Sequence, residues 1–385
     1  MIAGQRVGLV QRVLWASLAA LLALAGVGVG VHDAGSGGPS VRAVGELGVE
    51  EAGELSALDL VEVTTTTTPP PVVTAPPTTA APAPAVAPAP APAPKPAPAP
   101  KPRAAGLSVG RLHPPPVPVG LTPYVGLGTW VDVYDWTATY TNGKPAVGVA
   151  DVDRMADRGV QTLYIQASKW DAPQDIADPE LLRPLLRRAK ERGMRVVAWY
   201  LPTLVDPQRD LERLVAVAAL ADVDSLAVDI EARNVSNVED RNRRLVELSK
   251  ALRDALPGRT IGAIVLPPVV LEVVNPKYWP NFPYREIAPF YDVWQTMGYW
   301  TNRTEASGYR DAHRYTKENV ERLRRNVGVA ELPVHPIGGL GDETTPEDVE
   351  AFRRAAIETK SLGGSLYDWR TTKANAWPGM TGFRA

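Results

Sequence analysis

Two acidic side chains end a short apolar segment near the middle of the chain. Residues 225–231 read Ser-Leu-Ala-Val-Asp-Ile-Glu, a pattern typical of a buried strand. Alternate side chains of a strand share one face, so Asp229 and Glu231 should point to the same side, roughly 6–7 Å apart. At that spacing each negative charge raises the pKa of the other carboxyl group. The pair therefore predicts an acid that stays protonated near neutral pH, as general acid catalysis requires.

Such a pair needs a scaffold, and residues 119–385 predict a single (β/α)8 barrel, that is, an α/β TIM barrel. Apolar strand-like segments alternate with amphipathic helical segments along this whole region. The eight expected strands cover residues 127–133, 162–167, 196–201, 225–231, 261–266, 292–299, 334–340 and 365–369. The alternative, a doubly wound open sheet, is disfavoured because no glycine-rich nucleotide fingerprint follows a strand. We expect the site at the carboxyl ends of the strands.

Capping residues mark where several of the helices should begin. Asp206-Pro207 and Thr345-Pro346 each place a side-chain acceptor before a first-turn proline. Ser236 with Glu239 predicts a capping box. Pro184 lies inside the expected second helix and should kink it or delay its start. The last helix should be short or absent, since few residues follow the eighth strand.

The expected strand ends combine carboxylates, amides and aromatic rings. The side chains that we expect to bind substrate are Trp130, Gln166, Trp199, Tyr200, Gln295, Tyr299, Trp300, Asp368 and Trp369. Asp135, Trp170 and Tyr367 lie at the same ends without an assigned role. Sugar faces stack on such rings, so this composition favours a carbohydrate ligand. Alternatively, the glutamines fill the barrel interior and the rings only close its top.

Three short motifs at these strand ends carry a family resemblance. Asp229-Ile230-Glu231, with Asp292 five residues before Met297-Gly298-Tyr299 and Trp369 on the last strand, resembles the glycoside hydrolase family 18 chitinase pattern. Gly128-Thr129-Trp130-Val131-Asp132, with the same Asp-Ile-Glu, resembles the family 25 lysozymes. The resemblance covers roughly residues 124–372. Ser225 and Ala227 depart from the family 18 pattern, which has Gly and Asp there.

The resemblance implies a barrel that acts on polymers of N-acetylated amino sugars. Glu231 would be the general acid/base, and Asp229 would orient the acetamido group of the substrate. Tyr299 would hydrogen-bond to that group, Trp369 would form the floor of the sugar subsite, and Asp132 would be a third carboxylate of the site. Without the resemblance, Glu231 could instead cap the next helix or pair with Arg233, and Asp132 could serve a turn or an ion pair.

These observations predict a retaining glycoside hydrolase. The nucleophile is either a 2-acetamido group of the substrate, supported by Asp229, or the carboxylate of Asp132. A non-catalytic carbohydrate-binding barrel tethered to the cell envelope is the main alternative, and a barrel that serves only as a scaffold is a third. A pure binder has no need for Glu231.

Composition excludes several other kinds of function. The chain has no cysteine, so disulfides, thiolate metal sites and a cysteine nucleophile are excluded. Its four histidines have no metal-ligand spacing, and we expect neither a metal nor another cofactor. The formal charge is -2 without a basic stripe, which argues against nucleic acid as a partner. We expect a monomer whose partner is a polysaccharide.

The first 118 residues predict export. Residues 1–31 contain a long uncharged segment after Arg6 and Arg12, typical of a signal peptide or a membrane anchor. Residues 32–118 are first acidic and then rich in Thr, Pro and Ala, a composition that predicts a disordered linker. The barrel should therefore be secreted or held at the outer face of the cytoplasmic membrane.

Overall fold

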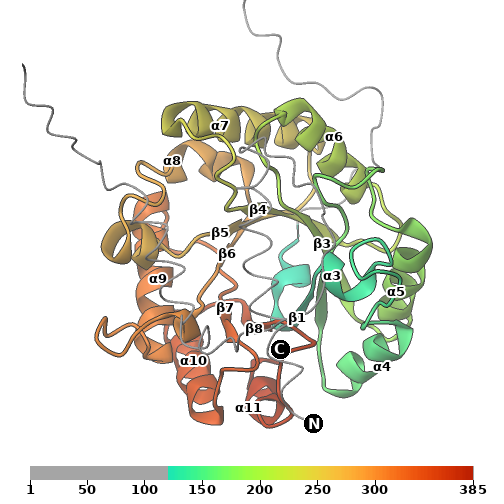
Figure 1. Cartoon of the computed structure of the whole chain (residues 1–385). Coiled ribbons are helices and arrows are strands. Elements are labelled where there is room, and N and C mark those ends of the chain that lie inside the picture. The colour runs from blue at the N-terminus through green and yellow to red at the C-terminus, as the bar shows by residue number, and fades with distance from the viewer. Residues whose placement is uncertain (1–119, 385) are drawn as a thin grey trace, which may run out of the picture.

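Eight parallel strands form the inner layer of the structure, a computed structural model that describes residues 120–384 (Figure 1). They are β1 (Gly126–Val131), β2 (Thr162–Gln166), β3 (Arg195–Tyr200), β4 (Ser225–Ile230), β5 (Ile261–Val265), β6 (Val293–Thr296), β7 (Ile337–Leu340) and β8 (Gly363–Tyr367). They pair in the order β6-β5-β4-β3-β2-β1-β8-β7. Parallel bridges from Trp294 to Val334 and from Met297 to Ile337 join the two edges. The sheet is thereby closed into a barrel.

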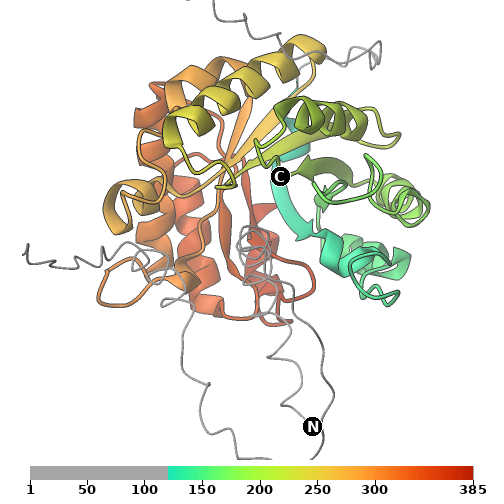
Figure 2. The same ribbon diagram turned by 45° about the horizontal axis from the view of Figure 1, so that its top comes forward.

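Helices surround the strands on the outside of the barrel (Figure 2). The longer ones are α4 (Val149–Asp157), α5 (Pro179–Glu191), α6 (Pro207–Ala218), α7 (Val238–Ala255), α9 (Ala312–Val327) and α10 (Pro346–Glu358). Short turns of helix include η1 (Thr122–Tyr124), α3 (Val133–Trp136), η2 (Val270–Val274), α8 (Tyr284–Ile287), η3 (Ala288–Phe290), η4 (Trp300–Asn302), α11 (Trp377–Met380) and η5 (Thr381–Phe383). Each long helix turns an apolar face to the sheet, as α10 does with Val349 and Phe352.

The predicted (β/α)8 architecture is therefore confirmed, and all eight strands are present. Their ends differ by at most three residues, at the end of β6 and at the start of β7, where pairing with β8 begins only at Ile337. The expected lack of a long last helix is also confirmed, because α11 has a single turn. The predicted signal or anchor segment and the linker lie outside the described residues. No helix among residues 120–384 combines the length and the apolar composition needed to cross a membrane.

The helix starts follow the capping predictions with one exception. The side chains of Asp206 and Thr345 accept hydrogen bonds from backbone N–H groups in the first turns of α6 and α10. At α7 the predicted Ser236 cap is wrong, because Asn237 accepts the hydrogen bond from the N–H of Asp240. Asparagine is an equally good cap and lies one residue closer to the helix. Pro184 lies inside α5, at its sixth residue.

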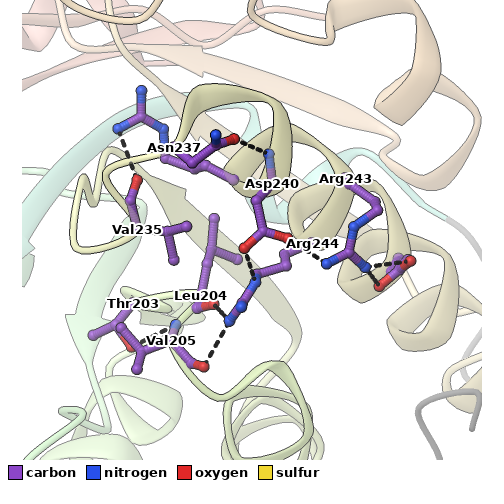
Figure 3. Close-up of polar contacts among 10 residues, drawn as sticks. Thr203, Leu204, Val205, Val235, Asn237, Asp240, Arg243 and Arg244 are labelled. Carbon is purple, nitrogen blue, oxygen red and sulfur yellow. Dashed lines mark hydrogen bonds and ion pairs between the residues drawn. The ribbon is translucent and has the colours of Figure 1, made fainter. Parts of the chain in front are cut away.

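Side chains of α7 fix the loops that follow β3 and β4 (Figure 3). Arg244 donates hydrogen bonds to the carbonyl oxygens of Leu204 and Val205, at 3.0 and 2.8 Å. The Arg244 guanidinium is itself held by Asp240, at 2.8 Å. Because backbone carbonyls and a charged side chain share one guanidinium, the loop after β3 is held against the start of α7. These two loops border the ends of β3 and β4, where the candidate site lies.

Candidate active site

The two acids of β4 lie at the carboxyl end of the barrel, as predicted. The side chain of Ser225 reaches Tyr124 inside the barrel, so the alternate residues Ala227 and Asp229 also face inward. Asp229 is in register with Ile264, and Ile264 is in register with Gln295, so these three side chains form one interior layer. Asp229 is 7% exposed, whereas Glu231 follows the strand and is partly exposed. Glu231 is thus the acid that a solute can reach.

Burial shifts the titration of both acids toward the neutral form. Desolvation raises the pKa of Glu231 to about 7. Burial, and then the charge of Glu231, raises the pKa of Asp229 well above its ordinary value. Burial is the first cause of both shifts. At neutral pH the pair therefore holds at least one proton, which is the condition for general acid catalysis.

A second group of acids lies across the mouth from the pair. One carboxylate oxygen from each of Asp132, Asp135 and Asp368 lies within 4.8 Å of the others. Asp132 accepts hydrogen bonds from the N–H of Tyr134 at 2.7 Å and from the hydroxyl of Tyr367 at 3.0 Å. Burial, and then the charges of Asp135 and Asp368, raise the pKa of Asp132 well above its ordinary value. Asp132 thus caps α3 and lies in the acid cluster, while its role as a carboxylate of the site stays a prediction.

Tyr299 joins the two groups of acids. Burial raises the pKa of its phenol well above 10, and the charges of Glu231, Asp229, Asp368 and Asp132 raise it further, in that order. Its ring centroid lies 5.9 Å from that of Tyr367. A neutral phenol beside four carboxyl groups is a hydrogen-bond donor at every physiological pH. The arrangement therefore places a donor and several acids together at the carboxyl end of the barrel.

The three clustered aspartates could geometrically hold a cation, but protein groups already bind their oxygens. Asp368 accepts hydrogen bonds from Thr371 at 2.9 Å, through both the N–H and the hydroxyl. Arg370 lies 3.3 Å from Asp135. Together with the donors to Asp132, these contacts satisfy oxygens that a metal ion would need.

Three of the predicted aromatic and amide residues lie inside the barrel. The ring of Trp130 stacks on Tyr164 at 4.4 Å, and its Nε1 donates to Ser365 at 2.8 Å. Trp199 meets Trp130 edge-on at 6.0 Å. Gln166 accepts a hydrogen bond from the N–H of Val133 at 3.2 Å, which matches its alternative role as interior polar filling. These side chains form the layers beneath the opening.

Three other predicted substrate-binding rings do not point into the barrel, so their predicted place in the site at the strand ends is corrected. Tyr200 faces the helix layer and donates to Asp210 of α6 at 2.6 Å. Trp300 is fully buried against Phe352 of α10. Trp369 turns outward, where its Nε1 donates to Asp151 of α4 at 3.1 Å. Because side chains alternate between the two faces of a strand, the neighbours Trp199 and Tyr200 must face opposite sides.

The tryptophan count also has a packing explanation. Five tryptophan side chains are at most 2% exposed: Trp130, Trp136, Trp279, Trp294 and Trp300. Large rings of this kind fill the barrel interior, as Trp130 does, and the space between the sheet and the helices, as Trp300 does. The composition by itself was therefore a weaker sign of a sugar ligand than the positions of individual rings.

Several buried polar atoms near the opening have no hydrogen-bond partner among residues 120–384. They are Oδ1 of Asp229, Nε1 of Trp199 and both amide atoms of Gln295. All three side chains face the barrel interior, as the strand registers require. Unpaired buried polar atoms cost free energy, so a polar solute or water that reached these atoms would be stabilised by hydrogen bonds to them.

Two residues without a predicted role complete the site. Tyr367 contacts Asp132, and Asp135 belongs to the acid cluster. The inward position of Tyr367 could have been predicted, because it lies two residues after the inward-facing Ser365 on β8. Asp292, part of the family-like motif, lies instead before β6 at the other end of the barrel, in an ion pair with Arg253 at 2.7 Å.

Comparison with known proteins gives a likeness at the level of the fold. No family model matches the chain, and no curated protein does. The spore cortex-lytic enzyme SleL of Bacillus cereus superimposes with a TM-score of 0.50 at 10% identity, covering 70% of this chain and 76% of that one. A class V chitinase from Pseudomonas fluorescens Pf-5 gives 0.50 at 10% identity, covering 68% and 100%. GH5_18 from Streptomyces cattleya, in complex with Manβ1-4GlcNAc, gives 0.50 at 15%, covering 67% and 78%.

Proposed function

We propose that this protein is an exported glycoside hydrolase that cleaves a polysaccharide containing N-acetylated amino sugars. The observation that carries the proposal is the state of Glu231, a partly exposed acid whose pKa is raised to about 7. It lies at the carboxyl end of the barrel, next to the buried Asp229. A spore cortex-lytic enzyme and a chitinase have the same fold, which supports a glycan substrate by analogy. The predicted envelope localisation agrees with a cell-wall or environmental glycan.

In the proposed reaction Glu231 first acts as the acid. Its proton passes to the glycosidic oxygen while the bond from that oxygen to the anomeric carbon breaks. Glu231 then accepts a proton from the water that attacks the anomeric carbon, which restores the acid. A pKa near 7 suits both steps, because the group can give and take a proton at neutral pH.

The nucleophile in this proposal is the 2-acetamido oxygen of the substrate. Asp132 is the competing candidate, but burial and two neighbouring acids raise its pKa, and a protonated carboxyl is a poor nucleophile. Asp229 has a buried oxygen without a partner, which can accept a hydrogen bond from the acetamido N–H. Tyr299 can donate to the same group. Two inversions at the anomeric carbon then give retention of configuration.

The proposal is tested by measuring the release of reducing ends from chitin, peptidoglycan and neutral glycans. Glu231→Gln should lower turnover of the preferred glycan by about 10²- to 10⁴-fold, because the proton donor is removed. Glu239→Gln, an exposed glutamate at the start of α7, is the matched control and should keep wild-type turnover.

The same measurements separate the alternatives. Wild-type turnover by Glu231→Gln would refute the assignment of the acid. Binding of glycan by the wild-type protein without release of reducing ends would favour the non-catalytic carbohydrate-binding barrel. The configuration of the first product, observed by NMR, tests retention.

A further inference from the structure

A groove of about 470 Å³ lies on the outside of the barrel, between α4, the loop after β8 and α11. Two indoles, Trp369 and Trp377, line it together with the guanidinium groups of Arg154, Arg158 and Arg370. The groove starts at the rim of the barrel, since Arg370 lies 3.3 Å from Asp135 of the acid cluster. A polymer that leaves the opening on this side would pass over it.

The two indoles are held in place before any ligand arrives. Their centroids lie 5.2 Å apart at an angle of 57°, so the rings form a corner. Asp151 fixes Trp369 through Nε1, while the ring remains partly exposed along the groove. Trp377 is only 5% exposed and supports the Trp369 ring from the side, so Trp369 offers the face on which a sugar can stack with little loss of conformational entropy.

The acids of the groove already have partners. Asp151 accepts hydrogen bonds from Arg154, from Trp369 and, at 3.0 Å, from the N–H of Gly148. Asp157 forms an ion pair at 2.6 Å with Arg192, which lies outside the groove. The negative charges of this wall are therefore largely neutralised, and an incoming anion would meet little repulsion.

The arginines, in contrast, keep donors available. Arg158 lies 5.8 Å from the centre of the Trp377 ring and forms no ion pair with a carboxylate among the described residues. The side chain of Arg154 is 59% exposed although it contacts Asp151. A planar guanidinium binds a carboxylate or another oxyanion through two parallel hydrogen bonds. An indole face beside exposed guanidinium groups matches a sugar that carries an acidic group.

We infer that this α4–α11 groove binds an acidic saccharide, with a sugar ring on Trp369 and an oxyanion on Arg154 and Arg158. The site is separate from the proposed hydrolytic site and would retain a charged glycan next to the opening. A carboxylate or a sulfate on the sugar would satisfy the same donors.

The inference is tested by calorimetric titration of the full chain with tetragalacturonate, a sulfated tetrasaccharide and neutral cellotetraose. The acidic sugars should bind, with affinity that falls as salt is added, and cellotetraose should bind at least about tenfold more weakly. The double variant Arg154→Gln/Arg158→Gln should lose about tenfold or more in affinity for the acidic sugar. Arg325→Gln, an exposed arginine at the end of α9, is the matched control and should bind like the wild type.

Three results would overturn the inference: equal affinity of the wild type and the double variant, equal affinity for cellotetraose, or displacement of the acidic sugar by equimolar inorganic phosphate. Thermal unfolding of the double variant checks that it is folded, and Arg158→Lys, which keeps the charge but loses the planar fork, should bind with intermediate affinity. Glu231→Gln should bind the acidic sugar like the wild type, because Glu231 does not line the groove. The binding result is therefore independent of whether the protein proves to be a hydrolase.

Discussion

The two ends of the barrel interior differ in how many of their buried polar groups have hydrogen-bond partners. At the amino end, the Tyr124 hydroxyl lies 2.9 Å from Ser225 Oγ and donates to the carbonyl of Leu226 at 2.8 Å. His335 contacts the carbonyl of Tyr124 at 2.8 Å and Ser365 at 3.1 Å. At the carboxyl end, Asp229 and Gln295 keep buried atoms without partners among residues 120–384. The amino end is thus the more fully hydrogen-bonded of the two, although the buried hydroxyl of Tyr164, beside Tyr124 and His335, also lacks a partner among residues 120–384.

The two ends also differ in what titrates near neutral pH. Burial lowers the pKa of His335 to about 4, so this imidazole stays neutral over the whole physiological range. Burial raises the pKa of Glu231 to about 7, so the carboxyl end changes charge within that range. The same cause, desolvation, shifts a base down and an acid up, because it disfavours the charged form of each. Changes at the two ends should therefore be distinguishable by experiment.

The largest expected contrast is in turnover. Asp229→Asn should lower kcat by about 10²-fold, because it replaces the acceptor proposed to hold the acetamido group. Ser225→Ala, on the same face of β4 at the amino end, should leave kcat unchanged. Steady-state kinetics on the preferred glycan measures both. Equal losses in the two variants would show that the ends do not differ in function.

The next contrast is the dependence of stability on pH. Glu231 has an ordinary pKa of 4.5 and a folded pKa of about 7, so between these values only the unfolded chain releases the proton. Stability should therefore fall as the pH rises from about 4.5 to about 7, by about 2 kcal/mol after allowance for partial exposure. Glu231→Gln should lack this part of the slope and be the more stable protein at pH 8.

Chemical unfolding of the wild type and Glu231→Gln at several pH values measures the difference. Parallel curves for the two proteins would contradict the raised pKa. Turnover by the wild type should fall on the alkaline side of about pH 7, because the acid is then deprotonated.

A smaller effect is expected at the amino end. Tyr124→Phe removes the buried hydroxyl that contacts Ser225 and Leu226, and should lower the free energy of unfolding by about 1–2 kcal/mol. The pH of maximal turnover should stay the same. Urea unfolding and a pH–rate profile test the two halves of this prediction, and a shifted profile would mean that the amino end influences the chemistry.

The smallest effect is expected at Gln295. Gln295→Leu removes two buried amide atoms without partners at nearly constant volume, so the variant should be as stable as the wild type or more stable by up to about 1 kcal/mol. Thermal unfolding measures the change. A loss of several degrees in Tm would mean that the amide has partners, such as bound water, in solution.

Local sequence was sufficient for the elements and for the acid pair of β4. The eight strands follow from apolar segments that alternate with amphipathic ones, and the inward direction of Asp229 follows from the period of a strand. The caps Asp206 and Thr345 were readable because their partners lie within one turn. The proposed export of the protein and the chemical roles of the site residues stay predictions.

What could not be read locally are the directions of rings in loops and the meeting of distant strands. Tyr367 and Asp132 are 235 positions apart and touch only because β8 and β1 are neighbours in the closed barrel. Trp369 follows β8, yet its partner is Asp151 of α4, and Trp300 is covered by Phe352 of α10. The alternation of side chains along a strand does not continue into those loops, so it could not predict where their rings point.

The sequence by itself determined an acid pair on a buried strand, since alternation of side chains is a property of consecutive residues. The tertiary structure decided which groups surround that pair and how far water is excluded from it. Desolvation sets the pKa of Glu231, and the degree of desolvation depends on every strand and loop that packs around the opening.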